Sequence, residues 1–169
     1  SRGVIIGSEL MHYSFDKAAD LLGLELIRIP VDEQYCISLP HLKEALKEVE
    51  SKGQRVTAMV AIAGTTDFGS VDPIADMAEL AHAQGAHLHV DGAWGGAMVL
   101  CDEGKVMLSD IHLADSVTID GHKQLMTPIG CGLLLTREVT TLGSIRKEAP
   151  YAIRSSSLDQ GRFTLEGTR

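Results

Sequence analysis

The sequence has 169 residues, of which 44% are hydrophobic and 22% are charged, so the chain can bury a core and its composition argues against intrinsic disorder. Its 15 basic and 23 acidic residues give a formal net charge of −8, which excludes a basic nucleic-acid surface and a polybasic membrane patch. The 3 cysteines form no CxxC pair, which favours a reducing, cytoplasmic compartment. No apolar run reaches the roughly 18 to 20 residues of a membrane span.

Short apolar runs rich in β-branched residues alternate with amphipathic stretches, a pattern typical of repeated strand and helix units. Strands are predicted at 24–29, 56–63, 86–91, 116–120 and 132–135, with a further short strand at 4–6. The run at 56–63 is almost continuously apolar, as in a parallel strand that is covered on both faces. These patterns predict an α/β fold with a mostly parallel sheet.

Three amphipathic helices are predicted to pack on this sheet. One covers 14–22, and a second covers 40–51 with apolar residues three and four positions apart. A third has Asp72 as its N-cap and Pro73 in its first turn, and it ends before Gly85. The helical spacing is sufficient to bury one side of each helix against the strands.

The two ends of the sequence differ from the middle. The chain opens without an initiator Met and stops without a tail-like composition, so we expect it to be a piece of a longer protein with elements missing at both ends. Periodicity is lost over 138–157, which we predict to be a mobile segment.

The densest polar cluster in an apolar setting is HLHVD at 87–91. Alternate residues of a strand share a face, so His87, His89 and Asp91 should point the same way, with Asp91 at the carboxyl end where α/β sheets place ligands. Three interpretations are open at this point: hydrogen-bonded core histidines with Asp91 capping the next turn, a metal site made by all three side chains, or a carboxylate that holds a protonated ring nitrogen of a cofactor.

A second cluster, SVTIDGHK at 116–123, places Lys123 just after a predicted strand. By itself Lys123 could be a surface lysine whose stem lies along apolar surface. With Asp91, and with His122 able to reach an anion, it completes the groups that pyridoxal 5′-phosphate requires: an amine, a carboxylate for the pyridinium nitrogen and a phosphate donor.

Taken in order, the motifs resemble those of the group II pyridoxal-phosphate-dependent amino-acid decarboxylases. They are SELMHYS at 8–14, KAA at 17–19, AGTT at 63–66, DPI at 72–74, HVDGAWGG at 89–96, ADS at 114–116 and HK at 122–123. Segments 7–14, 119–125 and 164–167 are most similar to aspartate 1-decarboxylases, with glutamate decarboxylases next. The resemblance implies the three-layer large domain of the aminotransferase-like fold (fold type I), incomplete at both ends.

The same resemblance implies roles for individual residues. Lys123 would form the internal aldimine with pyridoxal 5′-phosphate, and Asp91 would keep the pyridine nitrogen protonated. His12 would stack on one face of the cofactor ring and Ala93 would pack against the other, while Thr65 would lie close to the ring hydroxyl.

Three further residues carry implied roles. His122 would donate to the phosphate. Asp120 stands where many relatives have Asn, and because a carboxylate beside a phosphate is repulsive, either Asp120 turns away or a nearby cation compensates. Tyr151, within 138–157, resembles the catalytic-loop tyrosine that protonates the carbanion after carbon dioxide leaves.

The implied activity is decarboxylation of an acidic amino acid through a quinonoid intermediate, from aspartate to β-alanine or from glutamate to 4-aminobutyrate. The resemblance also implies a homodimer in the full-length protein. Two alternatives from other classes are a metal-dependent hydrolase built on His87, His89 and Asp91, and a catalytically silent fragment.

Overall fold

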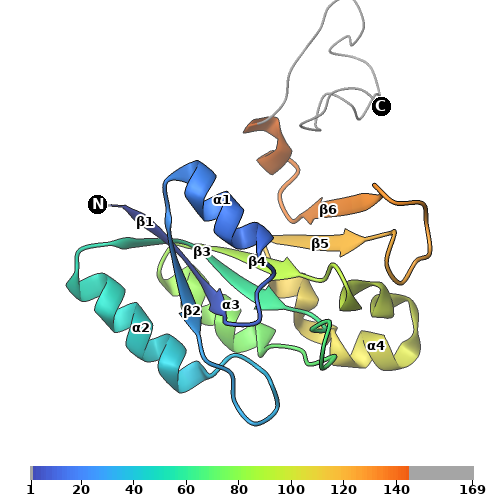
Figure 1. Ribbon diagram of the computed structural model, residues 1–169, viewed down its shortest axis with the longest axis horizontal. Coiled ribbons are helices and arrows are strands. Elements are labelled where there is room, and N and C mark those ends of the chain that lie inside the picture. The colour runs from blue at the N-terminus through green and yellow to red at the C-terminus, as the bar shows by residue number, and fades with distance from the viewer. Residues whose placement is uncertain (1, 145–169) are drawn as a thin grey trace, which may run out of the picture. The chain divides into compact units, whose positions relative to one another are not determined.

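Six strands form one sheet in the computed structural model, which describes residues 2–144 (Figure 1). The strands are β1 (Gly3–Ser8), β2 (Glu25–Ile29), β3 (Arg55–Ile62), β4 (His87–Asp91), β5 (Ser116–Asp120) and β6 (Gly132–Thr136), in the order β2-β1-β3-β4-β5-β6. Strands β1 to β5 pair in parallel, whereas β6 runs opposite to β5 in Figure 1. The predicted, mostly parallel α/β sheet is confirmed.

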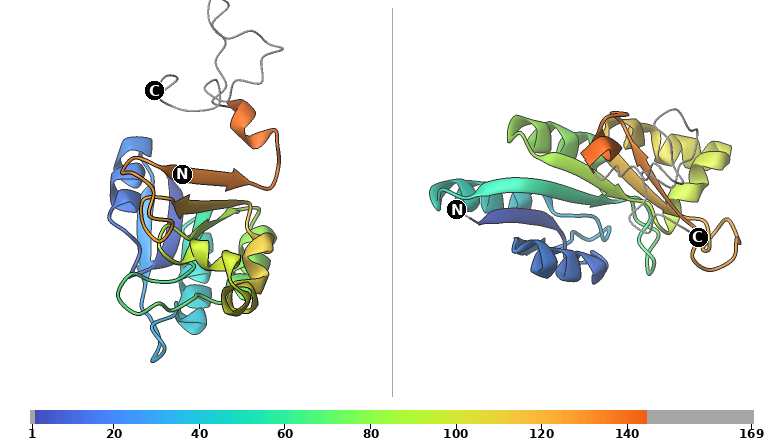
Figure 2. Two further views of the ribbon diagram at one scale, coloured as in Figure 1. Left: turned by 90° about the vertical axis from the view of Figure 1, so that its right-hand side faces the viewer. Right: turned by 90° about the horizontal axis from the view of Figure 1, so that it is seen from above.

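Helices cover both faces of the sheet because its inner strands are apolar on both. Val4 and Ile6 of β1 pack in the cluster that holds the buried residues of α2 (Leu39–Ser51) and α3 (Ile74–Ala83). The intervening Ile5 packs instead in the cluster that includes Ala19 of α1 (Ser14–Leu22). Figure 2 shows α1 and α3 on opposite sides of the sheet, so the fold has three layers.

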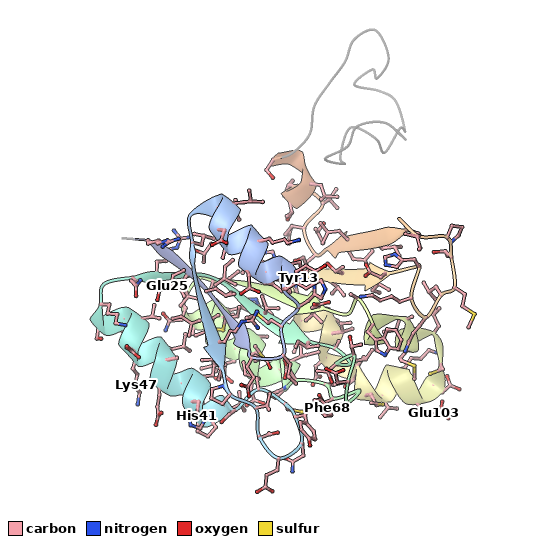
Figure 3. All side chains as sticks on the ribbon, in the orientation of Figure 1. Tyr13, Glu25, His41, Lys47, Phe68 and Glu103 are labelled. Carbon is pink, nitrogen blue, oxygen red and sulfur yellow. The ribbon has the colours of Figure 1, made fainter. Side chains whose placement is uncertain are left out.

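The helical spacing predicted from the sequence matches what these helices bury. Helix α2 turns Leu42, Leu46 and Val49 inward, and Lys47 lies on its outer side (Figure 3). The bounds of α1 agree with the prediction, and α2 begins one residue earlier than predicted.

The predicted cap at Asp72 is wrong. Helix α3 begins after Pro73 with no side-chain cap, and the buried Asp72 carboxylate instead accepts hydrogen bonds from the backbone N–H groups of Ile37 and Ile62, both at 2.7 Å. Burial raises the pKa of Asp72, and the two hydrogen bonds act against that rise. Asp72 therefore ties the end of β3 to the loop that precedes α2.

Three short helices between β4 and β5 have no counterpart in the predicted elements. They are η1 (Gly95–Leu100), α4 (Asp102–Met107) and η2 (Ser109–Leu113). Each is too short for a helical repeat to stand out in sequence. Gly104 in α4 is required by packing, because a side chain there would collide with the Met98 carbonyl.

The chain divides into two compact units, Ser1–Leu135 and Thr136–Arg169. In the second unit, the described residues form a single short helix at Thr141–Ser144. Tyr151 and most of the predicted mobile segment 138–157 lie outside the described residues. No helix within residues 2–144 has the length and apolar character needed to cross a membrane.

Candidate active site

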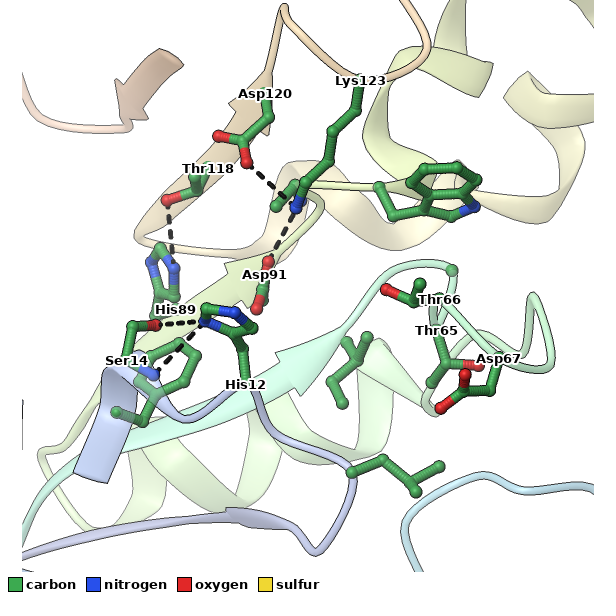
Figure 4. Close-up of a pocket in the computed structure, with 16 residues that line it drawn as sticks. His12, Ser14, Thr65, Thr66, Asp67, His89, Asp91, Thr118, Asp120 and Lys123 are labelled. Atoms are coloured by element: carbon green, nitrogen blue, oxygen red, sulfur yellow. Dashed lines mark hydrogen bonds and ion pairs between the residues drawn. The ribbon is translucent and has the colours of Figure 1, made fainter. Parts of the chain in front are cut away.

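A cavity of about 510 Å³ lies at the carboxyl ends of β3, β4 and β5, where a parallel sheet gathers the loops that follow its strands. Its lining includes six residues predicted from the sequence: His12, Thr65, Asp91, Ala93, Asp120 and Lys123. Figure 4 shows how they converge from separate elements. The fold therefore brings together residues that lie far apart in the chain, as His12 and Lys123 show.

Asp91 ends β4 and faces the cavity. Its Oδ1 accepts a hydrogen bond of 3.0 Å from the Ala93 backbone N–H, so the carboxylate caps the turn after the strand and is held in one orientation. Asp91 and Lys123 point toward one another in Figure 4. Asp91 thus caps the turn, as the first interpretation of HLHVD expected, and it also lines the cavity. Its role toward a cofactor stays a prediction.

Lys123 is placed by a tight turn after β5. Its backbone N–H donates to the Asp120 carbonyl at 3.2 Å, and its Nζ lies 3.0 Å from Asp120 Oδ2. The turn is close-packed, because a Cβ at Gly121 would lie 2.7 Å from the Cys131 sulfur. Lys123 is thus a cation beside the Asp120 carboxylate, and the arrangement of Asp120 relative to a phosphate stays a prediction.

His122 points elsewhere. Its Nδ1 donates to the Cys131 carbonyl at 2.9 Å, and its Nε2 lies 3.6 Å from Asp120 Oδ2. Unlike Lys123, it is not among the residues that line the cavity. Its role as a phosphate donor stays a prediction.

His12 lies in the loop between β1 and α1, at the side of the cavity. The Ser14 backbone N–H donates to His12 Nδ1 at 3.3 Å, so Nδ1 is an acceptor and a neutral ring carries its proton on Nε2. Arg28 of β2 holds this loop by donating to the carbonyls of Glu9 and Met11 at 2.9 and 3.1 Å. The position of His12 therefore depends on a neighbouring strand.

Thr65 opens the loop after β3 and is buried. Its Oγ1 accepts the Ser70 backbone N–H at 3.1 Å and lies 2.9 Å from Ser70 Oγ, so it closes a turn as well as lining the cavity. The preceding Gly64 has φ +85°, and a Cβ there would lie 2.7 Å from the Gly95 Cα. Glycine at both positions lets the loops after β3 and β4 touch behind the cavity.

His87 and His89 do not form a metal site. His87 Nε2 and His89 Nδ1 lie 2.7 and 2.8 Å from the same hydroxyl, Ser116 Oγ. Within residues 2–144, no group of three or more His, Cys, Asp or Glu side chains is arranged to hold a metal ion. The metal-site interpretation of HLHVD is therefore wrong for the described part of the chain, and these histidines are hydrogen-bonded residues of the sheet.

The sequence predicted only Asp120 from β5 as a site residue and missed two other polar residues of this strand. Thr118 lines the cavity, whereas Ser116 is buried outside its lining and lies within hydrogen-bond distance of His87 and His89. In the parallel register Ser116 is opposite His89 and Thr118 is opposite Asp91. The signal was present in the alternation of polar residues along 116–120, which repeats that of 87–91.

Comparisons with known proteins show the family to which this chain belongs. Residues 1–169 match the family described as the pyridoxal-dependent decarboxylase conserved domain. This chain belongs to that family. Its relatives include the aspartate 1-decarboxylase of Aliivibrio fischeri, 42% identical over 168 residues that cover 98% of this chain and 31% of the relative.

Another relative is the L-2,4-diaminobutyrate decarboxylase of Rhizobium meliloti, 39% identical over 88% of this chain and 30% of the relative. Among solved structures, Oryza sativa TDC with PLP and tryptamine superposes with a TM-score of 0.83 at 29% identity, over 90% of this chain and 32% of that one. The predicted fold type I large domain is confirmed by these likenesses, and the chain spans about a third of the length of these relatives.

Proposed function

We propose that the full-length protein is a pyridoxal-phosphate-dependent amino-acid decarboxylase and that this chain supplies the amine and the carboxylate that hold its cofactor. The observation that carries the proposal is the convergence of Lys123 and Asp91, from the ends of adjacent strands, on one cavity (Figure 4). Membership of the pyridoxal-dependent decarboxylase family supports the same conclusion.

The residues present fit a pyridoxal phosphate. The cavity of about 510 Å³ has room for a substituted pyridine ring, and the small side chain of Ala93 leaves one wall open. Lys123 offers an amine to the aldehyde, Asp91 offers a carboxylate to the ring nitrogen and Thr65 offers a hydroxyl near the ring. When bound, the cofactor supplies an electron sink for the electron pair that remains when the α-carboxylate leaves as carbon dioxide.

The chain's own residues would orient these groups and control protons. The Ala93 N–H holds the Asp91 carboxylate in place, so the negative charge is directed before a ligand enters. Asp120, 3.0 Å from Lys123 Nζ, balances the lysine charge when the amine is protonated. His12 presents a ring whose Nε2 can carry a proton beside the cavity.

We further propose that the substrate is an acidic amino acid, with aspartate converted to β-alanine as the first choice and glutamate to 4-aminobutyrate as the second. The 42% identity to an aspartate 1-decarboxylase supports aspartate. A diaminobutyrate decarboxylase at 39% identity is the main competitor. We also propose that the full-length protein is a homodimer and that it is cytoplasmic.

The test of the cofactor site is to add pyridoxal phosphate to the full-length protein, reduce with borohydride and map the adduct by mass spectrometry. We expect label on Lys123, no label in Lys123→Ala, and unchanged label in Lys105→Ala, whose exposed lysine pairs with Asp102 on α4. A reduced adduct at any other lysine would contradict the proposal.

The test of substrate is carbon dioxide release from aspartate, glutamate, 2,4-diaminobutyrate and aromatic amino acids. We expect aspartate to give the highest kcat/KM. Preference for diaminobutyrate would refute the acidic substrate and leave the cofactor site intact. Running the 169-residue chain beside the full-length protein tests whether the fragment alone is catalytically silent.

A further inference from the structure

One face of β4 and β5 carries a continuous line of hydrogen-bonded side chains that the proposed function does not use. Thr118 Oγ1 lies 3.3 Å from His89 Nε2, His89 Nδ1 lies 2.8 Å from Ser116 Oγ, and Ser116 Oγ lies 2.7 Å from His87 Nε2. The Thr118 end lines the cavity, as Figure 4 shows for Thr118 and His89. The His87 end lies at the first residue of β4, and its side chain is only partly buried.

We propose that Thr118, His89, Ser116 and His87 form a proton relay that connects the cavity beside Asp91 with the opposite end of the strands. These four side chains are called the relay. It rests on the proposed function for its purpose, because an amino acid arrives with a protonated amine, which must lose a proton before it can act as the nucleophile that displaces Lys123.

The single hydroxyl hydrogen of Ser116 makes the line directional. Ser116 can donate to only one imidazole and must accept from the other. When Ser116 donates to His87, it accepts the Nδ1–H of His89, so His89 Nε2 accepts the Thr118 hydroxyl. When Ser116 donates to His89, every hydrogen bond in the line reverses.

Switching between these two arrangements moves one proton along the line. Thr118 Oγ1 gains a proton from the protonated amine of the substrate, which becomes a neutral amine, and gives its own proton to His89 Nε2. His89 Nδ1 then gives its proton to Ser116, and Ser116 gives its proton to His87 Nε2. His87 then releases its Nδ1 proton to water. Each group forms one bond to hydrogen and breaks one, so all four end neutral.

Burial, rather than the carboxylates nearby, favours the neutral His89 that this line needs. Burial lowers the pKa of His89, and the nearby His87 lowers it further, whereas Asp91 acts to raise it. A neutral His89 is required, since an imidazolium would donate from both nitrogens and prevent reversal. At the outer end, Asp115 accepts a hydrogen bond from His82 at 3.1 Å and lies close enough to His87 to interact with its charge.

The inner end of the relay lies where a proton must move. Thr118 and Asp91 are paired residues in the parallel register of β4 and β5, so they share the cavity face. Ser116 is buried, with 6% of its surface exposed, so water cannot readily replace its hydroxyl. The middle of the line is therefore buried, and its other three side chains are partly exposed.

The test measures proton release when amino acid is added to the cofactor-loaded, full-length protein, followed by a pH indicator in weak buffer. Ser116→Ala should slow release by about tenfold or more, and Ser116→Thr, which restores a hydroxyl, should recover most of the rate. Ser38→Ala is the matched control, since Ser38 also hydrogen bonds a histidine, His41 Nδ1 at 2.8 Å, away from the cavity. It should leave the rate unchanged.

A second variant and a second measurement protect the conclusion. His87→Phe fills the same space at the outer end and should also slow proton release. In cofactor-free protein labelled at the histidine rings, NMR should show exchange-protected ring N–H signals that Ser116→Ala removes. If a separate borohydride-treated sample of Ser116→Ala carries the adduct on Lys123, unchanged proton release by the unreduced, cofactor-loaded variant would overturn the relay alone. Absence of that adduct would instead refute the cofactor site.

Discussion

Adjacent strands β3 and β4 differ in what their two faces carry. In β3, Met59 and Val60 are both buried although they point to opposite faces, so the strand is apolar on both sides. In β4, Leu88 is fully buried on the α3 side, whereas His89 and Asp91 on the other face are polar. The change from two apolar faces to one marks the boundary between the part of the sheet that stabilises the fold and the part that builds the cavity.

The physical reason is hydrogen bonding across the strands. A buried polar side chain destabilises the fold unless it finds a partner. Ser116 and Thr118 of β5 supply those partners to the histidines of β4. The polar face is therefore compatible with the fold, and substitutions on the two faces should have different consequences.

The largest expected effect is on stability, at the apolar face. Leu88→Ala should lower the free energy of unfolding by about 2 to 5 kcal/mol, because it leaves a cavity among residues of β3 and α3 that cannot collapse into it. Denaturant unfolding measures the change. Leu21→Ala, at a side chain 87% exposed on α1, is the control and should change it by less than about 0.5 kcal/mol. Equal losses of unfolding free energy in Leu88→Ala and Leu21→Ala would contradict the stabilising role assigned to the apolar face.

On the polar face, Asp91→Asn should reduce kcat/KM by about 100-fold or more, since the charge is lost while the oxygen that accepts the Ala93 N–H is retained. Stability of the cofactor-free protein should change little. Asp110→Asn, at an exposed position in η2, should leave activity as it is. Wild-type activity in Asp91→Asn would show that the Asp91 charge is not needed for the reaction.

A smaller effect is expected in the free energy of unfolding as pH falls. Because burial lowers the pKa of His89 below the roughly 6.5 of an unfolded chain, the unfolded state binds the proton more readily. The contribution of His89 to stability is therefore complete above about pH 6.5 and is lost below it, with a slope of up to about 1.4 kcal/mol per pH unit. Unfolding followed over pH 4 to 8 should show a shallower decline in His89→Gln, and parallel curves would contradict this.

Most of the fold could be predicted from the sequence because its strands and long helices carry clear periodicity. Strand β5 and helix α1 have the predicted bounds, and the other long elements shift by one or two residues. The segment at 95–113 could not be predicted, since its three helices have at most six residues each. Asp72 was wrongly predicted to be an N-cap because a carboxylate before a proline is typical of a helix start. Its two backbone hydrogen-bond partners, Ile37 and Ile62, are seen only in the tertiary structure.

The candidate site was predictable where chemistry and position coincide. Asp91 ends β4 and Lys123 follows the end of β5, and Ala93, Thr65 and His12 line the same cavity. Cross-strand partners were harder to predict. Ser116 is opposite His89 because of the register between β4 and β5, and that register cannot be read from the sequence alone. The hydrogen bond from His122 to the Cys131 carbonyl was also not predictable, because it depends on the turn after β5 and not on the sequence motif.

The loop after β3 is fastened to the loop before α2 at several points. Ser70 Oγ donates to the Tyr35 carbonyl at 2.8 Å, the rings of Tyr35 and Phe68 stack with centroids 3.7 Å apart, and Asp72 accepts the Ile37 N–H. Thr65 and its neighbours, which form this rim of the cavity, are therefore preorganised. A ligand that enters here loses less affinity to the ordering of the rim, so selectivity on this side should depend on shape rather than on induced closure.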